Sequence, residues 1–138
     1  MSYLQPTDDA VIKFLSRGIV GPVTMLNLLR FRELADYSDH PQLAPAVAIS
    51  GRAAFALYIE HTIPFLRETG GDLVYLGSGG DYLIGPVEEG WDMAMLVRQR
   101  SVEDFLAFAS HEAYLAGIGH RTAALSDSRI LPLLDEKI

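Results

Sequence analysis

The side chains best suited to chemistry in this sequence are polar or aromatic residues set within apolar segments. Tyr58 and His61 are three residues apart, a spacing that places them on one side of a helix, where both could act on the same proton. We therefore expect Tyr58 and His61 to be the catalytic pair if the protein is an enzyme. The alternative is an exposed or merely hydrogen-bonded pair.

A second group of side chains could bind a ligand. Asn27 interrupts the apolar face formed by Met25 and Leu29, and a buried amide needs hydrogen-bond partners, which either the fold or a ligand can supply. Arg30 and Arg32 make one end of the opposite face cationic, which suits a carboxylate or an enolate. Pairing of these arginines with acidic residues is the alternative.

Three more residues complete the expected ligand-binding set. Trp91 opens a strand, where an indole could stack on an aromatic ligand or fill the core or a dimer interface. Tyr114 could line the space between helices and sheet, and Arg121 could stabilise a developing oxyanion together with Asn27. The candidate ligand-binding residues are Asn27, Arg30, Trp91, Tyr114 and Arg121.

Other chemistries are disfavoured by residue type and spacing. The four histidines show no metal-ligand spacing, and the absence of cysteine excludes disulfides, thiolate metal sites and a cysteine nucleophile. The glycine-rich segment 77–80 has no lysine and opens no helix, so it predicts a bulge or bend instead of a phosphate loop. We expect no metal and no cofactor.

Length and charge restrict the class of protein and its partners. A chain of 138 residues with 49% hydrophobic and 21% charged residues is typical of one globular domain. The net charge of −7 disfavours nucleic acid and anionic membranes as partners, since both need clustered cations. No apolar run could span a bilayer and residues 1–10 do not form a signal sequence, so we expect a cytoplasmic protein that handles small molecules or proteins.

The elements that must position these residues are marked by capping and turn signals. Thr7 followed by two acids predicts a short helix, and residues 22–32 predict a strand with two apolar faces. Residues 33–49 predict a long loop, and Ser50 predicts the cap of a helix that closes at Gly70.

The second half of the chain predicts a hairpin, helices and a last strand. Segments 72–78 and 81–86 predict the two parts of an interrupted strand, and residues 87–90 predict a turn. A return strand begins at Trp91, and alternation places Met93 and Met95 on the same face of this strand as Trp91. Ser101 predicts the cap of a helix, a further helical turn surrounds Tyr114, and a last strand at 129–132 belongs at a sheet edge because it contains proline.

This order, βαββαβ after the first helix, predicts an α+β, ferredoxin-like fold with a four-stranded antiparallel sheet. We expect residues 1–21 to form an N-terminal helical extension and residues 22–138 to form the ferredoxin-like domain. Both helices would cover one sheet face, so we expect a homodimer through the other face, with Met93 or Met95 in the interface. The alternative is that the N-terminal helix covers that face in a monomer.

Several short motifs occur together in this order: Met25–Arg32, Tyr58, Gly70-Gly71, Leu83–Pro86, Trp91-Asp92, Ser101, Phe105 and His120–Arg129. The chain thereby resembles, over residues 23–132, the domain of unknown function 1330 family of the dimeric alpha-beta barrel superfamily. The resemblance implies a ferredoxin-like protomer that pairs sheet to sheet, and it implies no reaction. Related families include cofactor-independent quinone-forming monooxygenases, muconolactone-type isomerases and haem-degrading oxygenases, so by analogy a cavity for a flat organic molecule is expected.

Two functions of different classes follow from these residues. The first is a cofactor-independent oxygenase or isomerase of a small enolisable or aromatic compound, in which Asn27 with Arg30 or Arg121 holds the oxyanion and His61 or Tyr58 moves the proton. The second is a non-catalytic ligand-binding or interaction dimer.

A minor alternative is a haem-binding protein. The haem-degrading relatives use an Asn, a Trp and a His, and Asn27, Trp91 and His111 offer the same residue types. The match fails in detail, because Trp91 stands at the start of its strand and those relatives have the indole near the end.

Overall fold

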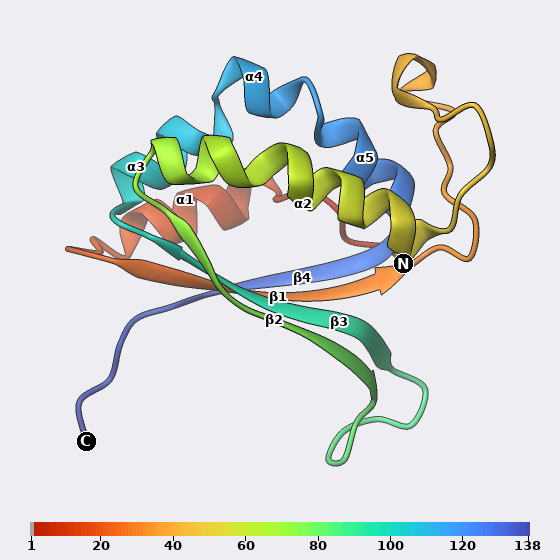
Figure 1. The fold of residues 1–138 in the computed structure, drawn as a ribbon. Helices are drawn as coiled ribbons and strands as arrows, with labels where there is room; N and C mark the ends of the chain where they lie inside the picture. The colour runs from red at the N-terminus through yellow and green to blue at the C-terminus, as the bar shows by residue number, and fades with distance from the viewer. Residues whose placement is uncertain (1) are drawn as a thin grey trace.

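Four antiparallel strands form one sheet in the computed structural model, which describes residues 2–138 (Figure 1). The strand order is β2-β3-β1-β4. The strands are β1 (Val23–Phe31), β2 (Asp72–Asp81), β3 (Gly90–Gln99) and β4 (Leu125–Leu133), and the helices are α1 (Asp8–Ser16), α2 (Gly51–Glu68), α3 (Val102–Ala109), α4 (Glu112–Leu115) and α5 (Ile118–Ala124). This is the predicted ferredoxin-like α+β fold with an additional N-terminal helix.

Local capping signals set where the main helices begin. The hydroxyls of Thr7, Ser50 and Ser101 each accept a hydrogen bond from a backbone amide in the first turn of α1, α2 and α3. Each cap satisfies an amide that has no partner within its helix. Gly70 has a φ of 87°, the left-handed conformation that closes α2 where the chain turns into β2.

The central hairpin differs from the prediction in its first strand. β2 runs without interruption through the glycine-rich segment 77–80, and residues 82–89 form the loop. The bulge lies instead near Val74, where the register of β2 against β3 shifts. Glycine is needed inside the strand because a side chain at Gly79 would collide with the backbone carbonyl of Trp91 on β3.

Strand alternation divides the two faces of the sheet. On β1, Met25, Asn27 and Leu29 are buried towards the helices, whereas Leu26 and Leu28 between them are only partly buried on the other face. The core lies between α2 and the sheet and contains Leu29, Phe55, Tyr58, Leu66, Met95, Phe108, Tyr114, Ala124 and Leu125.

Both methionines of β3 face the helices. Met95 belongs to the core and Met93 packs against it, so neither lies on the other face of the sheet, where one of them was expected. Leu96, which pairs with Leu26, lies there instead.

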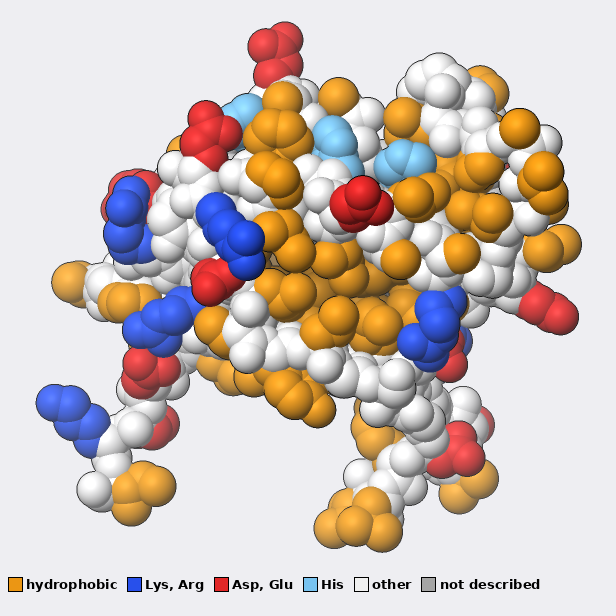
Figure 2. All heavy atoms as spheres, in the orientation of Figure 1, with side chains coloured by type: hydrophobic (Ala, Val, Ile, Leu, Met, Phe, Trp, Pro, Cys, Tyr) orange, Lys and Arg blue, Asp and Glu red, His pale blue; other side chains and the backbone are white. Residues whose placement is uncertain are grey.

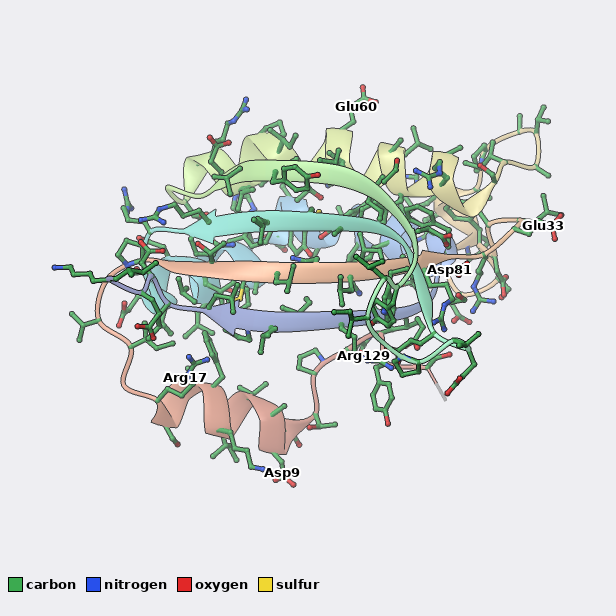
Figure 3. All side chains as sticks on the ribbon, turned by 90° about the horizontal axis from the view of Figure 1, so that it is seen from below. Asp9, Arg17, Glu33, Glu60, Asp81 and Arg129 are labelled. Carbon is green, nitrogen blue, oxygen red and sulfur yellow. The ribbon has the colours of Figure 1, made fainter. Side chains whose placement is uncertain are left out.

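The sheet face opposite the helices, called the open face below, is not covered by α1. The alternative in which the N-terminal helix folds over it is wrong, because α1 lies beside β4 on the helix side of the sheet (Figures 1 and 3). The rings of Phe14 and Phe105 pack edge to face at 5.9 Å, and Arg17 donates to the carbonyl of Pro132. No residue of α1 is fully buried.

None of the helices formed by residues 2–138 is both long enough and apolar enough to cross a membrane.

Candidate functional site

A cavity of about 1340 Å³ lies between the helices and the sheet. Its walls come from α1, α2, the α3–α5 segment and the inner faces of the four strands. On the side of the molecule drawn in Figure 2, hydrophobic side chains gather between α2 and the sheet beneath it. The apolar side chains of the lining include Phe14, Ile59, Leu66, Met95, Phe105 and Phe108. A concave, mostly apolar site with a few polar groups is typical of small-molecule binding.

Four of the predicted site residues line this cavity. Asn27 comes from β1, Tyr58 from α2, Tyr114 from α4 and Arg121 from α5. These elements are adjacent in space although they span almost one hundred positions of the sequence, so the fold brings the four side chains to one site.

The hydroxyls of Tyr58 and Tyr114 form the best-defined polar contact of the cavity wall. Their oxygen atoms are 2.8 Å apart, and both residues are buried. Burial, with Tyr58 close by, raises the pKa of Tyr114 far above its ordinary value, because the phenolate would lose its solvation. Tyr114 is therefore a neutral hydroxyl at physiological pH. Only one of the two hydroxyl hydrogens is used within the pair, which leaves the other for a ligand.

Asn27 has unused hydrogen-bonding capacity. It is 4% exposed, and its amide nitrogen donates to the carbonyl of Met25 on the same strand at 3.1 Å. Among the contacts of residues 2–138, this is the only hydrogen bond that the side chain makes. An amide can make more, so a ligand in the cavity could accept or donate here.

Arg121 joins the N-terminal segment to the sheet. Its guanidinium donates to the carbonyl of Leu4 at 2.7 Å and to the hydroxyl of Ser128 at 3.3 Å. Both acceptors are neutral. Within residues 2–138 no carboxylate lies within 4.0 Å of this guanidinium.

Among the polar residues of the cavity that were not predicted, two have a buried atom without a hydrogen-bond partner. The Oγ1 of Thr62 and the Oε1 of Gln99 are fully buried without a hydrogen-bond partner in residues 2–138, and both residues line the cavity. An unsatisfied buried polar atom is costly, so each would gain a hydrogen bond if a change of side-chain rotamer exposed it to a donor of the ligand. The hydrophobic pattern of the sequence could have identified both residues as candidates. Thr62 interrupts the apolar stripe of α2, and Gln99 is a polar residue on the inward face of β3.

His61 does not line the cavity. Its Nε2 is 2.8 Å from the carbonyl of Ala113, and its ring lies against Gly117. The structure thus separates the predicted catalytic pair. Residues three apart on a helix are offset around its axis, and here α4 packs so that Tyr58 points at the cavity and His61 at the α4 backbone.

Arg30 and Trp91 lie outside the cavity. The Arg30 guanidinium stands 4.7 Å from the centre of the Trp91 ring, and that of Arg129 stands 5.0 Å from it. Asp127 pairs with both arginines, at 3.5 and 2.8 Å. The Trp91 indole donates to the hydroxyl of Tyr82 at 2.6 Å. Arg30 therefore has an acidic partner, and Trp91, which is 4% exposed, is buried within a charged cluster outside the cavity.

Asp127 is the anion that holds this cluster together. It is 5% exposed. Burial acts to raise the pKa of its carboxyl, but hydrogen bonds from the backbone of Tyr3 and from Arg129 outweigh burial and hold the pKa below its ordinary value. The ionised form is thus favoured by the fold.

The residue types shared with haem-degrading enzymes are not brought together. Asn27 lines the cavity, Trp91 lies among the charged side chains of the sheet's other face, and His111 is 3.1 Å from the carboxylate of Glu68 at the surface. The residues therefore do not fit a haem. Residues 2–138 also contain no group of three or more His, Cys, Asp or Glu that could hold a metal ion.

Comparison with solved structures shows the family. The structure of RPA0582, a protein of unknown function from Rhodopseudomonas palustris, is similar over 100% of both chains, with 31% identity and a TM-score of 0.87. The methylated form of RPA0582 is similar over 99% of this chain and 96% of the other, with 32% identity and a TM-score of 0.86. The chain belongs to the same family as RPA0582.

A more distant similarity concerns a dimeric, ferredoxin-like protein of unknown function from Bacteroides fragilis. It is 12% identical over 81% of this chain and 94% of the other, with a TM-score of 0.48. No protein-family model matches the chain, and no curated protein matches it. The resemblance to the domain of unknown function 1330 family therefore stays a prediction.

Proposed function

We propose that this protein binds a small, largely apolar organic molecule in the cavity between the helices and the sheet. The observation that carries the proposal is the convergence of polar side chains from separate elements on one apolar cavity. Hydroxyls, amides and guanidinium groups can fix the orientation of a ligand, while the aromatic and aliphatic walls bury its body.

The residue types of the cavity favour binding over turnover. Among the described residues that line it there is no His, Asp or Glu, the side chains that most often serve as general bases near neutral pH. An oxygenase or isomerase would use Asn27, Arg121 and the tyrosine hydroxyls to hold an oxyanion, and Tyr58 would have to move the proton. We regard this enzyme as the second candidate.

We also propose that two copies pair through the open face of the sheet. Leu26, Leu28 and Leu96 are only partly buried there, and Tyr75 and Leu131 are 57% and 55% exposed. The β2–β3 loop, whose apolar residues include Leu83 and Ile84, extends beyond the sheet on the same side as the C-terminal segment (Figure 1). A second copy would cover this apolar surface, and the two extensions could reach around it. On its sequence motifs, we propose that the family is that of domain of unknown function 1330.

Native mass spectrometry of freshly purified protein tests both proposals in one measurement. We expect the mass of a dimer that carries a small molecule, and we expect the molecule to leave when the complex is activated. Extraction, identification and renewed incubation with the protein then separate the candidates. Recovery of the unchanged molecule supports binding, whereas a chemically altered product supports the enzyme.

A matched pair of variants on α3 links the ligand to the cavity. Ala109 lines the cavity, and Ala107 on the same helix is exposed. Ala109→Phe should lose the co-purified molecule because the ring fills its space, and Ala107→Phe should retain it. Retention by both folded variants would contradict the proposed site.

A further inference from the structure

The charged residues of the cavity wall are all cationic. Lys13, Arg17, Arg121 and Arg129 line the cavity, and no Asp or Glu does so among residues 2–138. The whole chain has the opposite balance, with 18 acidic residues against 11 lysines and arginines. The cavity thus favours a negatively charged ligand in a protein that is itself anionic.

The four cations differ in how far the fold already neutralises them. Arg129 is paired with Asp127 at 2.8 Å. Lys13 lies in α1 and Arg17 directly follows its last residue; both are exposed, and Arg17 donates to the carbonyl of Pro132 at the far end of β4 (Figure 3). Arg121 alone is partly buried and held only by neutral acceptors. A partly buried guanidinium without a counter-ion is an expensive arrangement that an anionic ligand would relieve.

The groups next to Arg121 suit a carboxylate. Ser128 places a hydroxyl on one side of the guanidinium, and Tyr114 lines the same cavity from the neighbouring helix α4. A guanidinium can grip both oxygens of a carboxylate, and a tyrosine hydroxyl can donate to one of them. Apart from Lys13, Arg17 and Arg129, the rest of the lining is predominantly apolar, with scattered hydroxyls and amides, which suits an uncharged body.

We propose that the ligand is an organic anion, a monocarboxylic acid with an apolar body, whose carboxylate lies against Arg121 beside the hydroxyls of Tyr58 and Tyr114. This inference rests on the proposed binding function of the cavity and adds the chemical class of the ligand. One guanidinium with neutral donors matches a single carboxylate, whereas a phosphate group would call for more cations at the same end of the cavity.

Two series of commercial probes test the charge requirement, with isothermal titration calorimetry as the measurement. The first is dodecanoate, 1-dodecanol and dodecylammonium, which share a flexible chain; the second is naphthalene-2-acetate and its amide, which share a flat body. We expect the carboxylate of at least one series to bind at least about tenfold more tightly than its neutral analogue, and dodecylammonium to bind most weakly. Equal binding of acid and neutral analogue would overturn the inference and leave the proposed function standing. Absence of binding by every probe would overturn both.

Variants of the cavity cations locate the carboxylate. Arg121→Gln should reduce carboxylate affinity by about tenfold or more and leave the neutral analogue within about twofold, while the control Arg67→Gln, at an exposed arginine outside the cavity, should change neither. Loss of the preference in Arg17→Gln but not in Arg121→Gln would overturn the assignment to Arg121.

Arg121→Lys is a second test of the same assignment, for use if Arg121→Gln does not fold. The lysine keeps the charge but cannot grip two oxygens, so the preference for the acid should fall without disappearing. A preference equal to that of the unaltered protein would overturn the assignment.

Discussion

The hydroxyl oxygens of Tyr58 and Tyr114 lie 2.8 Å apart, one on α2 and one on α4, at the wall of the cavity. This contact joins two helices that are separated by the whole β2–β3 hairpin in the sequence. It also gives the cavity a hydroxyl hydrogen that the fold does not use. The pair therefore contributes to both the fold and the candidate site.

The two hydroxyls of this pair should contribute to the free energy of unfolding in a non-additive way. Tyr58→Phe or Tyr114→Phe leaves the partner hydroxyl buried without its hydrogen bond, at a cost of about 1–3 kcal/mol in the free energy of unfolding. In the double variant no unpaired hydroxyl remains, so its loss should be smaller than the sum of the single losses. Urea denaturation of the three variants measures this. Strictly additive losses would show that the two hydroxyls do not interact.

Replacement of Asn27 by leucine separates a ligand contact from a structural amide. Asn27→Leu removes the amide at similar volume, and the only hydrogen bond lost among residues 2–138 is the one to Met25 on the same strand. We expect the melting temperature to stay nearly unchanged or to rise, while the affinity for the co-purified molecule falls by about 1–3 kcal/mol. Thermal melts and calorimetry on one preparation give both values. A destabilised protein with unaltered affinity would remove Asn27 from the site.

A charge on the open face should dissociate the proposed dimer. Leu26→Glu and Leu131→Glu each place a carboxylate where the second copy would bury an apolar side chain, so light scattering should give the monomer mass. Val47 is also apolar and exposed but lies in the loop that precedes α2, so Val47→Glu is the control and should stay dimeric. A dimer that survives charges at both positions would place the interface elsewhere.

Asp127 should make stability depend on pH in the acid range. The pKa of its carboxyl is lowered in the folded protein. The contribution of Asp127 to the free energy of unfolding is therefore fully present above the ordinary pKa of an unfolded aspartate, and it is lost as the pH falls through the pKa of the folded state. Asp127→Asn should cost about 1–3 kcal/mol near neutral pH, because Arg30 and Arg129 lose their anion. It should also lose less stability than the unaltered protein on acidification.

The control for this pH experiment is Asp39→Asn, at an exposed aspartate. Denaturant unfolding at neutral and acid pH should show no comparable change in this variant. An Asp127→Asn profile parallel to that of the unaltered protein would contradict the assigned role.

The sequence by itself determined the main helices and strands and their order, but it did not predict α5 (Ile118–Ala124) or the uninterrupted β2. Thr7, Ser50 and Ser101 mark helix starts through hydrogen bonds to amides three positions further on, and alternation on β1 separates its two faces. These signals act over a few residues, so they can be recognised without the fold. Asn27 was predictable as a candidate for the same reason, since a polar residue on an apolar strand face is a local anomaly.

The tertiary structure decided which candidates share a site. Whether Tyr58 or His61 faces the cavity depends on where α4 packs against α2, and no local pattern encodes that contact. Trp91 still pairs with Gly80 on β2 but lies beyond the β1–β3 pairing, which ends at Met93, and its ring is enclosed by Arg30 of β1 and Arg129 of β4. Side-chain direction at the end of a ladder and on the flank of a helix is set by long-range packing, because local geometry leaves several directions equally good.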